Sequence, residues 1–272
     1  MLIAALAAAG LAAGPVLRWL IVRLSVPSGE PWRRSCPGCG DPLPPARRTA
    51  AFAPRPQTAL TAPGRRTALT APGRLRALPV LPPGGRCPSC RARLGPPALT
   101  VEVTAAVVLG LLAARIHPGL VLAAMCWLAL CTIPLAYIDA ATRRLPDLLT
   151  GPAFAGTAAL LVAAAAAGGH WSALGRAVLG GAAFAAFCLV LLLISPSGMG
   201  AGDVKLAASL GTALAWLGWG ALAAGALAGF VLGAGYGAAL LVARRASRAT
   251  QLPFGPFLIA GTFLVLLIAG LG

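Results

Sequence analysis

Two aspartates lie at the ends of predicted membrane helices, where a pair of carboxylates can hydrolyse a peptide bond. Asp139 closes one apolar stretch and Asp203 opens another, and the whole chain has only six acidic residues. A carboxylate at the border of an apolar helix is costly and is expected to have a task. Two carboxylates that share one water in a poorly solvated site can act as general base and general acid. The spacing therefore indicates an aspartyl dyad, with a salt bridge of each aspartate to Arg143, Arg144 or Lys205 as the alternative.

Three glycines precede the second aspartate in the segment that begins at Gly198. Gly200 and Gly202, directly before Asp203, would let the main chain pass close to the carboxylate and to an extended substrate, because they lack a side chain. We expect them to support the dyad. The alternative is an ordinary loop between two helices.

Two further charged residues lie near the dyad in the sequence. Asp147 follows a leucine-proline pair, and we assign it a supporting or structural role. Lys205 is the only lysine in the chain and comes two positions after Asp203. It is expected either to tune the dyad or to anchor the helix at the lipid headgroups.

Four of the seven cysteines form two CxxC pairs, Cys36 with Cys39 and Cys87 with Cys90. A two-residue spacing lets both thiolates of a turn reach one ion, so the pairs favour a structural zinc site. Disulfides or redox pairs, and thiols without a ligand, are the alternatives. A disulfide is less favoured because we place this segment in the reducing cytoplasm.

The composition is that of a membrane protein. Hydrophobic residues make up 58% of the 272 positions, charged residues only 10%, and the mean hydropathy is +0.85. A soluble chain of this length would not show this combination. We therefore predict an all-α, polytopic transmembrane bundle of about eight spans. The predicted spans are 2–24, 99–116, 120–138, 148–167, 177–194, 204–219, 220–242 and 257–271. Cys126, Cys131 and Cys188 lie inside them and are expected to be small buried apolar residues.

The positive charge follows the predicted topology. The net charge is +16, and twelve of the 22 basic residues lie between Arg33 and Arg93, after the first span. The positive-inside rule then places this insertion in the cytoplasm and both chain ends outside, with the first span as a retained anchor. The expected organisation is a first span at 1–24, a Cys-rich cytoplasmic insertion at 25–98, and a membrane-embedded peptidase domain at 99–272. A nucleic-acid partner is not expected, because the arginine-rich segment has too few aromatic residues for base stacking.

The insertion contains a short duplication. The eight residues 58–65 recur as residues 67–74. This tract is rich in proline, arginine and alanine and is too short and polar to build a core, so we expect a flexible insert.

Taken together, these motifs resemble the bacterial type IV prepilin leader peptidases, which are membrane aspartyl proteases with a GxGD motif. The resemblance depends on residues 200–203 (GAGD), on Asp139 followed by residues 145–147 (LPD), and on residues 253–256 (PFGP) before the last span. A GxGD sequence alone is a weak signal. Its occurrence with the other motifs, in this order, on a polytopic chain with paired CxxC after the first span is specific. The resemblance covers the chain from about Gly14 to the C-terminus.

The resemblance implies a bacterial inner-membrane enzyme that serves a type IV pilus or type II secretion system. It would cleave the short basic leader of type IV prepilins or pseudopilins at the cytoplasmic face, with Asp139 and Asp203 as catalytic pair. Bifunctional members also methylate the new N-terminus with S-adenosylmethionine, an activity associated with the CxxC region, and Arg86 and Glu102 fit that pattern. The 47 residues between the CxxC pairs exceed the usual length. An asparagine common in the first span is also not evident, so the resemblance leaves methylation open.

Two other functions are compatible with the same residues. A GxGD intramembrane protease with a different substrate would keep the dyad. A membrane transporter could use the embedded acids to relay protons or bind cations. The transporter is disfavoured, because the segment around Asp139 has no repeat in the other half of the chain, as an internally duplicated transporter would show.

Overall fold

A computed structural model describes residues 1–27, 30–43, 85–87, 89–97, 99–196, 198–244 and 252–269. Its regular elements are eight α-helices, so the predicted all-helical architecture is confirmed. The helices are α1 (Leu2–Leu24), α2 (Thr100–Arg115), α3 (Leu120–Thr142), α4 (Asp147–Gly168), α5 (Trp171–Ile194), α6 (Ala201–Leu217), α7 (Trp219–Val242) and α8 (Gly255–Ala269). The duplicated tract at 58–74 lies outside the described residues.

Five of the helices are long and apolar enough to cross a bilayer. They are α1, α3, α4, α5 and α7, with 22 to 24 residues each. A helix of about 20 residues spans the hydrocarbon core. The helices α2, α6 and α8 are shorter, with 16, 17 and 15 residues. The chain is therefore a multi-pass membrane protein, while the division at residues 24 and 98 stays a prediction.

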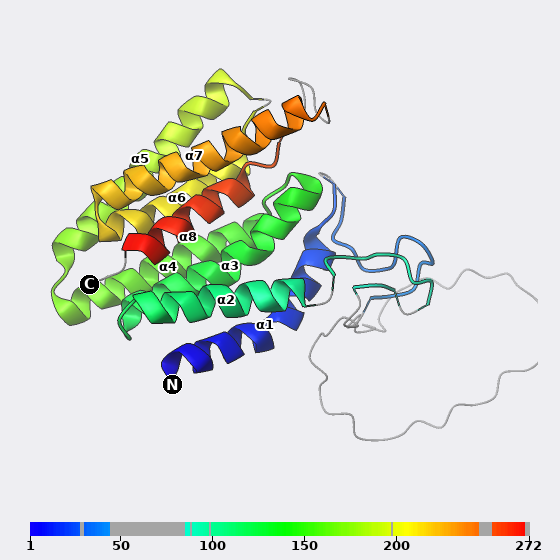
Figure 1. Cartoon of the computed structure of the whole chain (residues 1–272), viewed down its shortest axis with the longest axis horizontal. Coiled ribbons are helices and arrows are strands. Elements are labelled where there is room, and N and C mark those ends of the chain that lie inside the picture. The colour runs from blue at the N-terminus through cyan, green and yellow to red at the C-terminus, as the bar shows by residue number, and fades with distance from the viewer. Residues whose placement is uncertain are drawn as a thin grey trace, which may run out of the picture.

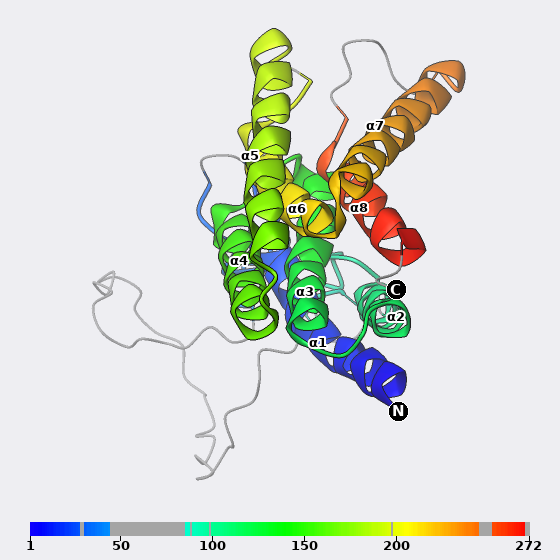
Figure 2. The ribbon, with the colours of Figure 1, turned by 90° about the vertical axis from the view of Figure 1, so that its left-hand side faces the viewer.

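Successive helices pair as antiparallel hairpins, and two helices occupy the middle of the bundle (Figure 1). The helix α6 contacts α3, α4, α5, α7 and α8, and the helix α3 contacts α1, α2, α4, α6 and α8. Figure 2 shows α3 and α6 between the outer helices. The two central helices are the ones that carry Asp139 and Asp203, so both aspartates enter the core of the bundle.

The first two helices approach closely because α1 presents glycine to α2. A Cβ atom added at Gly10 would lie 2.7 Å from the carbonyl of Ala105, and one added at Gly14 would lie 2.7 Å from the Cα of Glu102. Glycines spaced by four residues lie on one face of a helix and allow this kind of contact in membranes. The contact brings Glu102 against α1.

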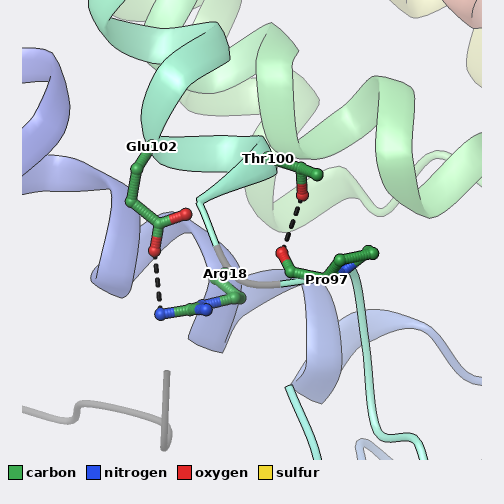
Figure 3. Close-up of polar contacts among 4 residues, drawn as sticks. All are labelled: Arg18, Pro97, Thr100 and Glu102. Carbon is green, nitrogen blue, oxygen red and sulfur yellow. Dashed lines mark hydrogen bonds and ion pairs between the residues drawn. The ribbon is translucent and has the colours of Figure 1, made fainter. Parts of the chain in front are cut away.

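One turn beyond Gly14, a buried ion pair joins the same two helices (Figure 3). A guanidinium nitrogen of Arg18 lies 2.8 Å from Oε1 of Glu102, and both side chains are buried. The hydroxyl of Thr100 donates to the carbonyl of Pro97 at 2.8 Å and holds the turn that enters α2. A charge in an apolar bundle needs a partner, so this pair fixes the register of α1 on α2.

The ion pair generates a stability prediction. Arg18→Leu leaves the Glu102 carboxylate buried without its cation, and we expect the free energy of unfolding to fall by about 3–5 kcal/mol. Adding Glu102→Gln removes the isolated charge and should recover part of this loss. Thermal unfolding in one detergent, followed by tryptophan fluorescence, measures both variants. A double variant no more stable than Arg18→Leu would contradict the role of the pair.

Candidate active site

The structure places Asp139 and Asp203 on the wall of a single cavity. Asp139 lies in the last turn of α3 and Asp203 in the first turn of α6, with exposed fractions of only 4% and 6%. Both line a cavity of about 120 Å³. Asp139 and Asp203 are 64 positions apart in the sequence, and the ends of their two helices bring both carboxylates to one small space. Such a space can hold a water and the backbone of a peptide.

Each carboxylate has one oxygen held by a main-chain donor. The N–H of Gly255 donates to Oδ2 of Asp139 at 3.0 Å, and the N–H of Gly200 donates to Oδ2 of Asp203 at 2.9 Å. The other oxygen of Asp203, Oδ1, is buried and has no hydrogen-bond partner among the described residues. Buried polar atoms are paired in most proteins, so an unpaired carboxylate oxygen in a cavity indicates a site for water or substrate.

Local helix geometry explains where the two side chains lie. Gly200 is the N-cap of α6, and an acid at the third helical position can accept the N-cap N–H and complement the positive end of the helix dipole. Asp139 lies near the C-terminus of its helix, where the negative end of the helix dipole makes a carboxylate unfavourable. The hydrogen bond from Gly255 offsets this cost. It is supplied by α8, 116 residues further along the chain.

Sequence reasoning placed the two aspartates but did not assign the other walls of the cavity. Arg143, Met199, Leu252, Pro253 and Phe254 also line it. Most of them belong to the two loops that precede α6 and α8, and the proline-flanked motif at 253–256 was the sequence signal for the second loop. The donor role of the glycine in that motif could not be read from the sequence, because it depends on how α8 packs on α3.

The other two supporting residues pair with each other at a separate place. The ammonium of Lys205 lies 2.7 Å from Oδ1 of Asp147, and both side chains are exposed. They line a second pocket of about 310 Å³ between α4 and α6, which shares no residue with the wall of the dyad cavity. In this arrangement, the lysine ties the start of α4 to α6.

The four paired cysteines come together in one cluster. Their Sγ atoms all lie within 4.8 Å of one another, and all four thiols are free. Cys36 and Cys90 are 3.5 Å apart at Sγ, and Cys39 and Cys87 are 3.6 Å apart. Backbone N–H groups of Cys90 and Ser89 lower the pKa of Cys87 to about 6, whereas the neighbouring thiols and burial raise the pKa of Cys39 and Cys90, so Cys87 is the thiol favoured as thiolate. This cluster could bind a metal ion.

The cysteine cluster is fixed to the end of the bundle that carries the dyad. Cys36 and Cys87 pack with Leu43 and Leu94 against Val22 of α1. On the same side, a guanidinium nitrogen of Arg144, just beyond α3, donates to the carbonyl of Pro27 at 3.0 Å. The remaining cysteines, Cys126, Cys131 and Cys188, are buried in α3 and α5.

Comparison with known proteins supports the predicted resemblance. Residues 120–238 match the type IV leader peptidase family. A prepilin leader peptidase/N-methyltransferase of Aeromonas salmonicida is 33% identical over 188 residues, covering 67% of this chain and 62% of that protein. The protein of the same name from Pseudomonas aeruginosa is 33% identical, covering 68% and 62%. The one from Burkholderia pseudomallei is 39% identical, covering 65% and 56%.

The chain therefore spans less than two thirds of the length of these relatives. No solved structure matches it significantly. The family match includes both Asp139 and Asp203, and the resemblance predicted from the motifs is confirmed.

The two glycines of the GxGD motif should differ in their tolerance of a methyl group. A Cβ at Gly202 would lie 2.7 Å from the Cβ of Leu145, whereas one at Gly200 would meet nothing closer than Oδ2 of Asp203 at 3.5 Å. We expect Gly202→Ala to destabilise the protein by about 1–3 kcal/mol through overpacking. Gly200→Ala, as matched control, meets no such overlap and should cost less, about 0.5–1 kcal/mol, because alanine is a poorer N-cap than glycine. Thermal unfolding in detergent compares them, and equal losses would contradict the assignment.

Proposed function

We propose that this chain is a membrane aspartyl endopeptidase that removes the leader of type IV prepilins or pseudopilins, because residues 120–238 match the type IV leader peptidase family. The relatives carry this activity in their names. The observation that carries the proposal is the pair of buried carboxylates on one cavity, with Oδ1 of Asp203 lacking a hydrogen-bond partner in the described part of the chain.

The proposed reaction is general acid and base catalysis without a covalent intermediate. One aspartate is ionised and takes a proton from the attacking water, while the other is protonated and donates a hydrogen bond to the scissile carbonyl. The resulting tetrahedral diol then breaks its C–N bond, and the departing amine takes up a proton from the dyad. The N–H groups of Gly200 and Gly255 hold one oxygen of each carboxylate, which directs the other oxygen of Asp203 to the water.

We place the chain in the bacterial inner membrane, with the dyad at the cytoplasmic face and both ends outside. The distribution of arginine supports this orientation, because the described residues of the basic insertion lie at the same end of the bundle as the dyad. The substrate would be a prepilin or pseudopilin precursor with a basic leader, and the lipid bilayer would be the surrounding medium.

We further propose that the cysteine cluster holds one structural zinc ion. Four thiolates at about 2.3 Å from one zinc would lie about 3.8 Å from each other, and the observed Sγ distances of 3.5 and 3.6 Å fit this spacing. The zinc would tie residues 36–39 to residues 87–90. The names of the relatives favour a second activity, in which S-adenosylmethionine supplies a methyl group to the new N-terminal amine.

The dyad is tested by isosteric substitution. Asp139→Asn or Asp203→Asn removes a group that must change protonation state, so either should slow leader removal from a co-expressed prepilin by about 10²- to 10⁴-fold. Mass spectrometry of the product N-terminus measures cleavage and shows whether a methyl group is added. Glu30→Gln makes the same chemical change at an exposed position and serves as control. Cleavage at the wild-type rate in either aspartate variant would contradict the assignment of Asp139 and Asp203 as the catalytic pair.

The zinc proposal concerns composition and does not depend on cleavage. The purified protein should contain about one zinc per chain by elemental mass spectrometry. Cys36→Ser should lose the metal, whereas Cys126→Ser, the same change in a buried membrane position, should keep it. Equal zinc content in both variants would rule out the cluster as the site.

A further inference from the structure

Three phenylalanines form a continuous row from the outer surface of the bundle to the dyad cavity. The rings of Phe187 on α5 and Phe230 on α7 meet edge to face with centroids 5.6 Å apart. The rings of Phe230 and Phe254, in the loop before α8, are 5.0 Å apart. We call these three residues the aromatic row. It joins segments that are far apart along the chain and ends at the wall of the dyad cavity, which Phe254 lines.

Exposure decreases along the row. Phe187 is 51% exposed on the surface that faces lipid, and Phe230 and Phe254 are half-buried. Beyond Phe254 lie the buried carboxylates, and the neighbouring N–H of Gly255 holds Asp139. The row therefore connects the hydrocarbon region with the catalytic cavity through apolar side chains alone.

The two helices that carry the outer part of the row diverge toward the dyad end. The middle of α5 and the start of α7 are close, because a Cβ added at Gly180 would lie 3.2 Å from Leu222. Toward their C-terminal ends the two helices separate (Figure 2). The last residues of both helices, among them Ile194 at 75% and Val242 at 85%, are exposed. The aromatic row thus lies where a further apolar segment can approach from the side.

The pocket between α4 and α6 is the competing route to the dyad. It is larger, at about 310 Å³, and contains Phe154 and the ion pair of Lys205 with Asp147. It shares no residue with the wall of the dyad cavity, whereas the aromatic row includes one. Continuity with the cavity therefore favours the side of α5 and α7.

We propose that the aromatic row is the docking surface for the apolar, membrane-embedded segment of the substrate next to the scissile bond. Aromatic rings offer a large apolar contact area without needing hydrogen bonds to a partner, which suits recognition of an apolar helix in lipid. The segment reaches the dyad laterally from the bilayer, passing Phe187 and Phe230 before the peptide bond meets the two carboxylates. This inference rests on the proposed function and specifies the substrate class and its path.

Site-specific cross-linking tests the path. A photoreactive benzoylphenylalanine is placed at position 187 or, as matched control, at position 154, which has a similar exposure of 46%. Both are made in the Asp203→Asn background so that a co-expressed prepilin stays uncut. We expect the adduct with the prepilin to form at position 187 at least about five times more efficiently than at position 154. An adduct that forms equally at both positions, or mainly at 154, would overturn the docking surface.

Kinetics with a purified prepilin gives a second readout. Phe187→Ala should lower kcat/KM about tenfold, mostly through KM, because it removes contacts with a part of the substrate that does not react. Phe187→Leu, which keeps apolar area, should recover part of the loss, and Phe154→Ala should stay near wild type. If the wild type cleaves the prepilin and Phe187→Ala does so equally well, the docking surface is wrong while the proposed function holds. A wild type that cleaves no prepilin would contradict the proposed function and, with it, this inference.

Discussion

Every carboxylate in an apolar bundle needs a hydrogen-bond donor or a cation as partner, and the fold depends on this constraint. From residue 99 onward the chain has four carboxylates, and each has such a partner. Glu102 pairs with Arg18 and joins α2 to α1, Asp147 pairs with Lys205 and joins α4 to α6, and Asp139 accepts the N–H that starts α8. Because an isolated buried charge costs several kcal/mol, the contacts of Glu102, Asp139 and Asp203 fix the register of their helices, whereas the exposed pair of Asp147 and Lys205 contributes little.

Small residues make these contacts reachable. Gly14 brings α1 against Glu102, and Gly202 brings the start of α6 against Leu145. Gly255 has no room for a side chain either, because a Cβ there would lie 2.9 Å from Oδ2 of Asp139. Association of helices in lipid depends on such close packing, since apolar area alone does not distinguish a helix partner from lipid. The glycines therefore allow the close helix packing that places the two aspartates at one cavity.

The end of the bundle that carries the dyad also carries the cysteine cluster. The cluster packs on the end of α1, and Arg144 links the residues after α3 to the loop after α1. The loop that leads from α1 to the first CxxC pair is thus tied by a hydrogen bond to Arg144, five residues beyond Asp139.

The sequence alone determined the elements, because hydropathy and the bilayer thickness restrict a membrane chain to helices of known length. All eight predicted spans are helices, with most ends displaced by a few residues. The largest displacement is at α5, which begins at Trp171 instead of 177, since Arg176 can stay helical by donating to the carbonyls of Ala215 and Trp216 at 2.7 and 2.6 Å. Only the tertiary structure decided which partners the charges take. Local patterns carry no information about contacts between segments that are distant in the chain. Three such contacts are the hydrogen bond from the N–H of Gly255 to Asp139, the ion pair of Arg18 with Glu102 and the row of three phenylalanines.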